Sequence, residues 1–196
     1  MTSYSDKIPR SAYLLVLGLV AVWIAGAFIA PVGIARGWIS ADQPPAIRPG
    51  DHGLPDLLAL VIHAAYGRVC HQMPDRSFWI QGHPMAVCAR CSGIYLGYFA
   101  GLLIYPLVRQ RLNAGLPRRR WLIVALLPVA VDFTGAWLGV FENTLASRTA
   151  TGFIAGAAGA IYTAPGLVAA ARSALTSILA RYHAWFLKQP GGAYDA

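Results

Sequence analysis

Residues 91–108 read CSGIYLGYFAGLLIYPLV, a run of 18 residues without a charged side chain. An α-helix rises about 1.5 Å per residue, so a run of this length approaches the thickness of a bilayer's hydrocarbon core, about 30 Å. Glycine recurs at every fourth position, at Gly93, Gly97 and Gly101. This spacing lets a second helix approach closely. The stretch therefore predicts a membrane-spanning helix with another helix packed on its glycine face.

Three further apolar runs are long enough to cross a bilayer. With the first run extended outward, the predicted spans cover residues 11–35, 87–108, 121–141 and 149–171. A cleaved signal peptide is the alternative for residues 11–35, but this run exceeds the roughly 7–15 apolar residues of such signals. The expected fold class is an all-α integral membrane protein. It is a four-helix transmembrane bundle formed as a single membrane domain over residues 1–196.

The composition of the whole chain favours the same class. Hydrophobic residues make up 57% of the 196 residues and charged residues only 12%, against about a quarter charged in a soluble domain. The net charge of +8 does not indicate nucleic acid, because the cations cluster beside the apolar runs. We expect a lipid bilayer as the partner and no nucleic acid.

The arginines predict the orientation in the membrane. The connection between the second and third spans holds no acid and five arginines: Arg109, Arg111, Arg118, Arg119 and Arg120. Positive residues stay on the cytoplasmic side. We therefore expect a multi-pass protein of the inner (cytoplasmic) membrane, with both termini cytoplasmic and the loop at residues 63–91 extracytoplasmic.

Two weaker apolar patterns flank this core. Residues 54–69 are too short to span and predict an interfacial helix. Residues 172–188 are weakly amphipathic and predict a tail on the membrane surface.

The loop at residues 63–91 concentrates metal-ligating side chains. Thiolates two residues apart on a turn can converge on one ion, and a second pair about 15–20 residues away completes many zinc sites. Here the first pair is Cys-His, whose adjacent side chains do not easily bind one ion together. One of two histidines is therefore expected beside three cysteines. The predicted ligands are Cys70, His71 or His83, Cys88 and Cys91.

A predicted hairpin would bring these ligands together. Residues 77–80 and the residues from His83 onward have the pattern of two short strands around a turn at Gly82. Such a hairpin returns the chain so that Cys70 approaches Cys88.

The cysteines leave alternatives open. Copper(I) is the less favoured ion, suggested by the soft thioethers of Met73 and Met85 in the same loop. Thiol–disulfide chemistry is the second function, since a C-x-x-C pair at a helix start has a lowered thiol pKa. Cysteines that serve only as small core residues are the third reading.

Asp132 is the one charge inside the predicted third span, residues 121–141. A carboxylate there costs about 2.5–3.5 kcal/mol on insertion scales and usually has a partner. Arg90, a bound cation, or the hydroxyls of Tyr95 and Thr134 could serve. Asp132 is a candidate acid or base, or the ion-binding group of a small transporter or channel, for which four short spans would form a homo-oligomer. Glu142 and Arg148, in the next outer loop, are the other catalytic candidates.

The cysteine motif also resembles a known family. Cys70-His71-Gln72, Arg76-Ser77-Phe78 and the run from Val87 to Gly97 are similar to the prokaryotic membrane proteins called domain of unknown function 2085. Pro128, Asp132, Glu142-Asn143, Arg148 and Thr151-Gly152 extend the resemblance. It implies a membrane protein and sets Asp132, Glu142 and Arg148 beside the cysteines. It implies no reaction, so whether the protein is an enzyme stays open.

Overall fold

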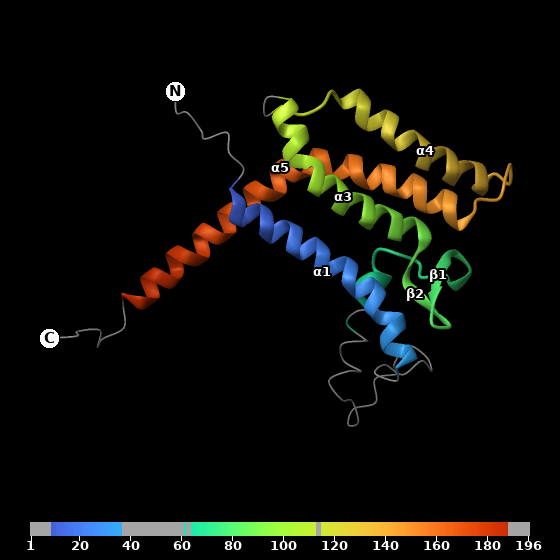
Figure 1. The fold of residues 1–196 in the computed structure, drawn as a ribbon, viewed down its shortest axis with the longest axis horizontal. Coiled ribbons are helices and arrows are strands. Elements are labelled where there is room, and N and C mark those ends of the chain that lie inside the picture. The colour runs from blue at the N-terminus through green and yellow to red at the C-terminus, as the bar shows by residue number, and fades with distance from the viewer. Residues whose placement is uncertain (1–8, 37–60, 62–63, 113–114, 188–196) are drawn as a thin grey trace.

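The computed structural model describes residues 9–36, 61, 64–112 and 115–187, and the regular secondary structure in this part of the chain is helical apart from one small hairpin (Figure 1). Within the described residues, four helices are long and apolar enough to cross a membrane. They are α1 (Arg10–Ala35), α3 (Ala89–Arg111), α4 (Arg119–Trp137) and α5 (Leu145–Phe186). The predicted fold class, an all-α membrane protein with four helices, is confirmed.

Large apolar side chains cover the outer faces of these helices. Val22 is 72% exposed, Ile123 62% and Phe133 57%. Apolar surface on this scale would be unfavourable in water, because soluble monomers rarely expose contiguous apolar patches larger than a few hundred Å². The exposed faces are therefore the lipid-contacting faces of a membrane protein.

The centre of the bundle is a close backbone contact between α3 and α5. A Cβ atom built on Gly97 would lie 2.0 Å from the carbonyl oxygen of Phe153, and one on Gly156 would lie 2.1 Å from that of Ile94. Gly93 and Gly101 face α5 in the same way. No side chain larger than hydrogen fits between the helices at these positions. The predicted glycine face is confirmed, and α5 is the helix that packs on it.

This contact makes a testable prediction. Gly97→Ala is expected to push α3 and α5 apart and to destabilise the protein by about 1–3 kcal/mol or more, as overpacking does. Gly159→Ala on α5 is the matched control, because a Cβ there meets nothing within 4 Å. Thermal unfolding in detergent compares the two variants. Equal unfolding temperatures would show that the helices are not in backbone contact.

α1 packs across the bundle and touches both of its ends. Near its start, Ala12 and Val16 lie in a buried cluster with Leu102 and Val168. Near its end, Ala27 and Ala30 lie in a second cluster with residues from the loop that precedes α3. α1 thus links the core of the bundle to the candidate site.

α5 is longer than the predicted fourth span. It continues for 42 residues, about 63 Å at 1.5 Å per residue, so its later part extends beyond a core of about 30 Å (Figure 1). The expected surface tail, residues 172–188, belongs to this helix up to Phe186. After Gly166, no glycine or proline interrupts the helix before its end. The helix therefore continues through the polar residues of this later part.

α4 is shorter than predicted. It ends at Trp137 rather than at residue 141, because the chain turns at Gly139, where φ is +69°, and the ring of Phe141 folds back over Gly135. The predicted helix at residues 54–69 lies largely outside the described residues, although residues 64–67 are helical.

Candidate metal centre

The predicted hairpin is present. Strand β1 (Ser77–Ile80) pairs antiparallel with β2 (His83–Cys88), and Ser77 lies opposite Cys88. The two turn residues, Gln81 and Gly82, have φ of 52° and 81°, as the favoured two-residue hairpin turns require. β2 leads directly into α3, so the hairpin places Cys88 at the first turn of that helix.

Cys70 is held from the other side by α1. Its backbone N–H donates to the carbonyl oxygen of Tyr66 at 2.8 Å. The Tyr66 ring lies 4.6 Å from that of Trp23 on α1, and its hydroxyl donates to the Trp23 carbonyl oxygen. Tyr66 is 3% exposed. The buried tyrosine therefore fixes the segment that carries Cys70 against α1.

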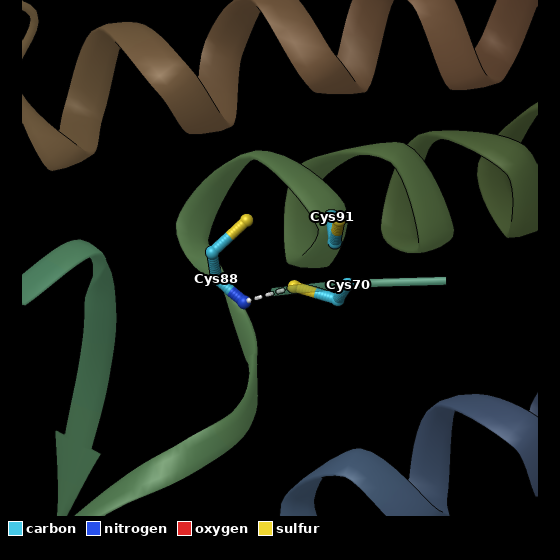
Figure 2. Close-up of side chains that lie close together, drawn as sticks. All are labelled: Cys70, Cys88 and Cys91. Atoms are coloured by element: carbon cyan, nitrogen blue, oxygen red, sulfur yellow. Dashed lines mark hydrogen bonds between the residues drawn. The ribbon is translucent and has the colours of Figure 1, made fainter. Parts of the chain in front are cut away.

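These two supports bring the three cysteines together at the start of α3 (Figure 2). The sulfur atoms of Cys70, Cys88 and Cys91 all lie within 4.8 Å of one another. No disulfide joins them; Cys70 is buried and the other two are half-buried. Zn–S bonds of about 2.3 Å in a tetrahedron place sulfur atoms about 3.8 Å apart. The cluster is thus about 1 Å wider, at most, than a zinc site requires.

The surroundings of the cluster favour a thiolate at Cys88. The backbone N–H of Cys88 donates to Cys70 Sγ at 3.2 Å, as Figure 2 shows. Hydrogen bonds from the Cys70 and Cys91 thiols lower the pKa of the Cys88 thiol. Cys88 is also the N-cap residue of α3, where the helix dipole favours negative charge. A thiolate at this position is a metal ligand or a nucleophile.

Neither His71 nor His83, the alternative candidates for a fourth ligand, belongs to the group of close ligand atoms. His71 is exposed, directly after Cys70. His83 begins β2 and Cys88 ends it, so their Cα atoms are about 16 Å apart at 3.3 Å per strand residue. Among the described residues, the group of three or more possible ligands consists of the cysteines alone. His63 lies outside the described residues.

The methionines of the loop are separated. Met85 is 4% exposed and lies in the same buried cluster as Cys70, whereas Met73 is 38% exposed. Met73 is therefore not part of this buried cluster.

Asp132 forms a hydrogen-bonded network beside the cysteines. Its carboxylate accepts from the guanidinium of Arg90, from Ser147 Oγ at 2.8 Å and from Asn143 Nδ2 at 3.2 Å. The side chains of Asp132 and Arg90 are 6% and 16% exposed. Arg90 was one of the partners expected from the sequence. Because Arg90 stands between Cys88 and Cys91, the network ties α4 and the start of α5 to the cysteine motif.

Glu142 and Arg148, the other two catalytic candidates, differ in their exposure and surroundings. Glu142 is exposed, and within the described residues it forms no ion pair with Arg148. Arg148 is half-buried on the first turns of α5, close enough to Cys88, Asp132 and Arg90 for the charges to interact. The structure therefore places Arg148 beside the cysteines and leaves Glu142 at the surface.

Sequence reasoning missed Ser147 and Tyr66, and it named Asn143 only within the family resemblance, without its contact to Asp132. Thr144 and Ser147 form a capping box at the start of α5, but Ser147 stands where the sequence signature of such a box has Glu or Gln. Nothing in the sequence indicated the contact of Tyr66 with Trp23, which depends on how α1 packs.

The fold and the site together define a class: a small helical membrane protein with three clustered cysteines at one end of its bundle. The family model described as "Predicted membrane protein", domain of unknown function 2085, matches residues 70–162. This range begins at Cys70 and includes Cys91, Asp132 and Arg148.

Two uncharacterised archaeal proteins are similar to this chain. One, from Methanocaldococcus jannaschii, is 45% identical over 108 residues, which cover 55% of this chain and 69% of the relative. Another, from Methanothermobacter thermautotrophicus, is 35% identical over 95 residues, 48% of this chain and 84% of the relative. No solved structure matches. The chain belongs to the family of domain of unknown function 2085.

Proposed function

We propose that this membrane protein binds one zinc ion through the thiolates of Cys70, Cys88 and Cys91. The observation that carries the proposal is the approach of all three sulfur atoms to within 4.8 Å, from a loop and a helix start whose cysteines, Cys70 and Cys88, are 18 positions apart. Three thiolates with zinc carry a net charge of −1, and Arg90 stands between two of the three ligands, Cys88 and Cys91. Zinc sites with three protein ligands keep a fourth position for water or substrate, so such an ion could act as a Lewis acid.

Metal analysis of the purified protein tests this proposal. We expect about one zinc per chain. The three thiols should react with a thiol reagent only after a chelator removes the metal. Copper in place of zinc would change the identity of the bound ion and leave the proposed three-cysteine site unchanged. Absence of any metal, with full reactivity of the thiols before chelation, would contradict the proposal.

Thiol–disulfide exchange is the second candidate function. It is favoured by the C-x-x-C pair at the start of α3 and by the lowered pKa of the Cys88 thiol. The same purified protein distinguishes the two functions. A reducible disulfide between Cys88 and Cys91, in protein free of metal, would favour exchange.

A transport function for Asp132 has less support. Arg90, Ser147 and Asn143 already engage its carboxylate. A transported cation would have to displace the buried, positively charged side chain of Arg90 from the carboxylate of Asp132.

For the membrane topology, we propose a single membrane domain in the inner (cytoplasmic) membrane, with cytoplasmic termini and the cysteine cluster outside. The support is the arginine-rich connection between α3 and α4, which lies away from the cluster. The hydroxyl of Tyr162, far along α5, donates to the carbonyl oxygen of Arg118 at 2.9 Å.

Single introduced cysteines test this topology. In intact cells, Glu142→Cys should react with a membrane-impermeant maleimide, whereas Arg119→Cys should react only after the membrane is opened. Both positions are exposed, and the parent protein with its native cysteines gives the background. The reverse pattern of labelling would refute the orientation.

A further inference from the structure

An open apolar groove runs along the first turns of α5. Its lining consists of Phe78 of β1 and α5 residues between Leu145 and Ile154, chiefly Leu145, Ala150, Phe153 and Ile154. Its volume is 690 Å³, within the range of about 300–1,000 Å³ of small-molecule sites. Phe153 and Ile154 are 41% and 44% exposed. In a bilayer such a groove is open to an acyl chain.

Two arginines flank this groove. Arg148 stands on the same turns of α5, and Arg76 precedes Phe78 by two residues. The two guanidinium groups are close enough to repel each other, and Arg90 adds a third positive charge to the surroundings of Arg148. Like charges at the edge of a low-dielectric region are unfavourable without a compensating anion.

The described residues do not supply that anion fully. No hydrogen bond or ion pair joins the Arg148 guanidinium to another described side chain. The nearby carboxylate of Asp132 is engaged by Arg90. Arg76 meets Asp75 only at 3.5 Å in an exposed pair, and such pairs contribute little. The nearby Cys88 thiolate would belong to the metal site.

We propose that this groove, with Arg76 and Arg148, binds an anionic phospholipid. The phosphate contacts the two guanidinium groups, which suit phosphate geometry, and one acyl chain lies along α5 over Ala150 and Phe153. A lipid fits better than free phosphate because the charged edge and the apolar groove are continuous. This site does not depend on the metal.

Lipid binding to the full chain in a neutral detergent tests the proposal, with phosphatidylglycerol and phosphatidylcholine as probes. Native mass spectrometry gives the apparent affinities. We expect wild-type protein to prefer phosphatidylglycerol on the order of ten-fold, from two arginines near the headgroup. Arg148→Gln should remove most of this preference. Ala150→Trp should weaken the binding of both lipids, because the larger side chain fills the groove. Arg181→Gln, on the exposed far end of the same helix, is the matched control.

Three results would overturn the proposal. These are equal affinity of the wild-type protein for both lipids, unchanged binding in both groove variants, and complete displacement of phosphatidylglycerol by inorganic phosphate. The last result would reveal a site for a free anion. Metal content, measured in the same samples, separates this outcome from the zinc proposal. Lipid preference that persists after chelation supports the lipid site whether or not zinc binds.

Discussion

Replacement of any one of Cys70, Cys88 and Cys91 by serine is expected to weaken zinc binding by more than about 100-fold, since even changes outside the ligand shell cost 10–100-fold. The reason is geometric. The three sulfur atoms form one cluster within 4.8 Å, and a serine hydroxyl does not replace a thiolate on zinc. Competition with a chromophoric chelator measures the affinity of each variant. The three variants should be equally defective.

The histidines provide the controls for this experiment. His83→Ala should leave zinc affinity within about two-fold, because His83 is at the opposite end of β2 from Cys88. His71→Ala should behave similarly, since His71 is exposed. Strong loss of zinc in either variant would show that the loop closes further around the ion. Loss of function in only the Cys88 and Cys91 variants would favour thiol–disulfide exchange.

The membrane helices were predictable because the bilayer imposes a simple requirement. A span needs about 20 apolar residues, and the four apolar runs all became helices. The ends of the helices were less predictable. α5 crosses the predicted limit at residue 171 because a helix can continue into water after its apolar part ends. α4 stops early at a turn whose geometry depends on Gly139 and on the packing of Phe141.

The cysteine cluster was partly predictable. Turn chemistry at Gly82 indicated the hairpin, and the hairpin brought Cys70 to Cys88. Sequence spacing did not decide which histidine could complete the site. His83 lies only five residues before Cys88, but the two residues are at opposite ends of strand β2. The contact of Tyr66 with Trp23 joins residues 43 positions apart, and nothing local encodes it.

The free-energy cost of placing a carboxylate within a membrane span singles out Asp132 but does not give its role. The cost of a carboxylate within a span implied a partner, and Arg90 was among those expected. The sequence did not distinguish an ion pair from a catalytic acid. The structure adds Ser147 and Asn143 to the carboxylate, which is the pattern of a group held in place.

Asp132→Asn is expected to destabilise the protein by about 3–5 kcal/mol, because it leaves the guanidinium of Arg90 buried without a counter-charge. Zinc affinity should fall as well, by about 10–100-fold, since Arg90 stands between Cys88 and Cys91. Thermal unfolding in detergent and chelator competition measure the two effects. Glu142→Gln is the matched control, because its side chain is exposed and surface changes usually stay within about 0.5 kcal/mol.

The double variant Arg90→Gln, Asp132→Asn separates a positioning role from a catalytic one. If the two residues act as a pair, the double variant should be more stable than the sum of the single variants predicts, since no lone charge stays buried. Asp132→Glu should restore part of the stability and of the zinc affinity by keeping the charge. Full stability and zinc affinity in Asp132→Asn would contradict a positioning role. A role of Asp132 as an acid or base would then have to be tested by a measurement of activity.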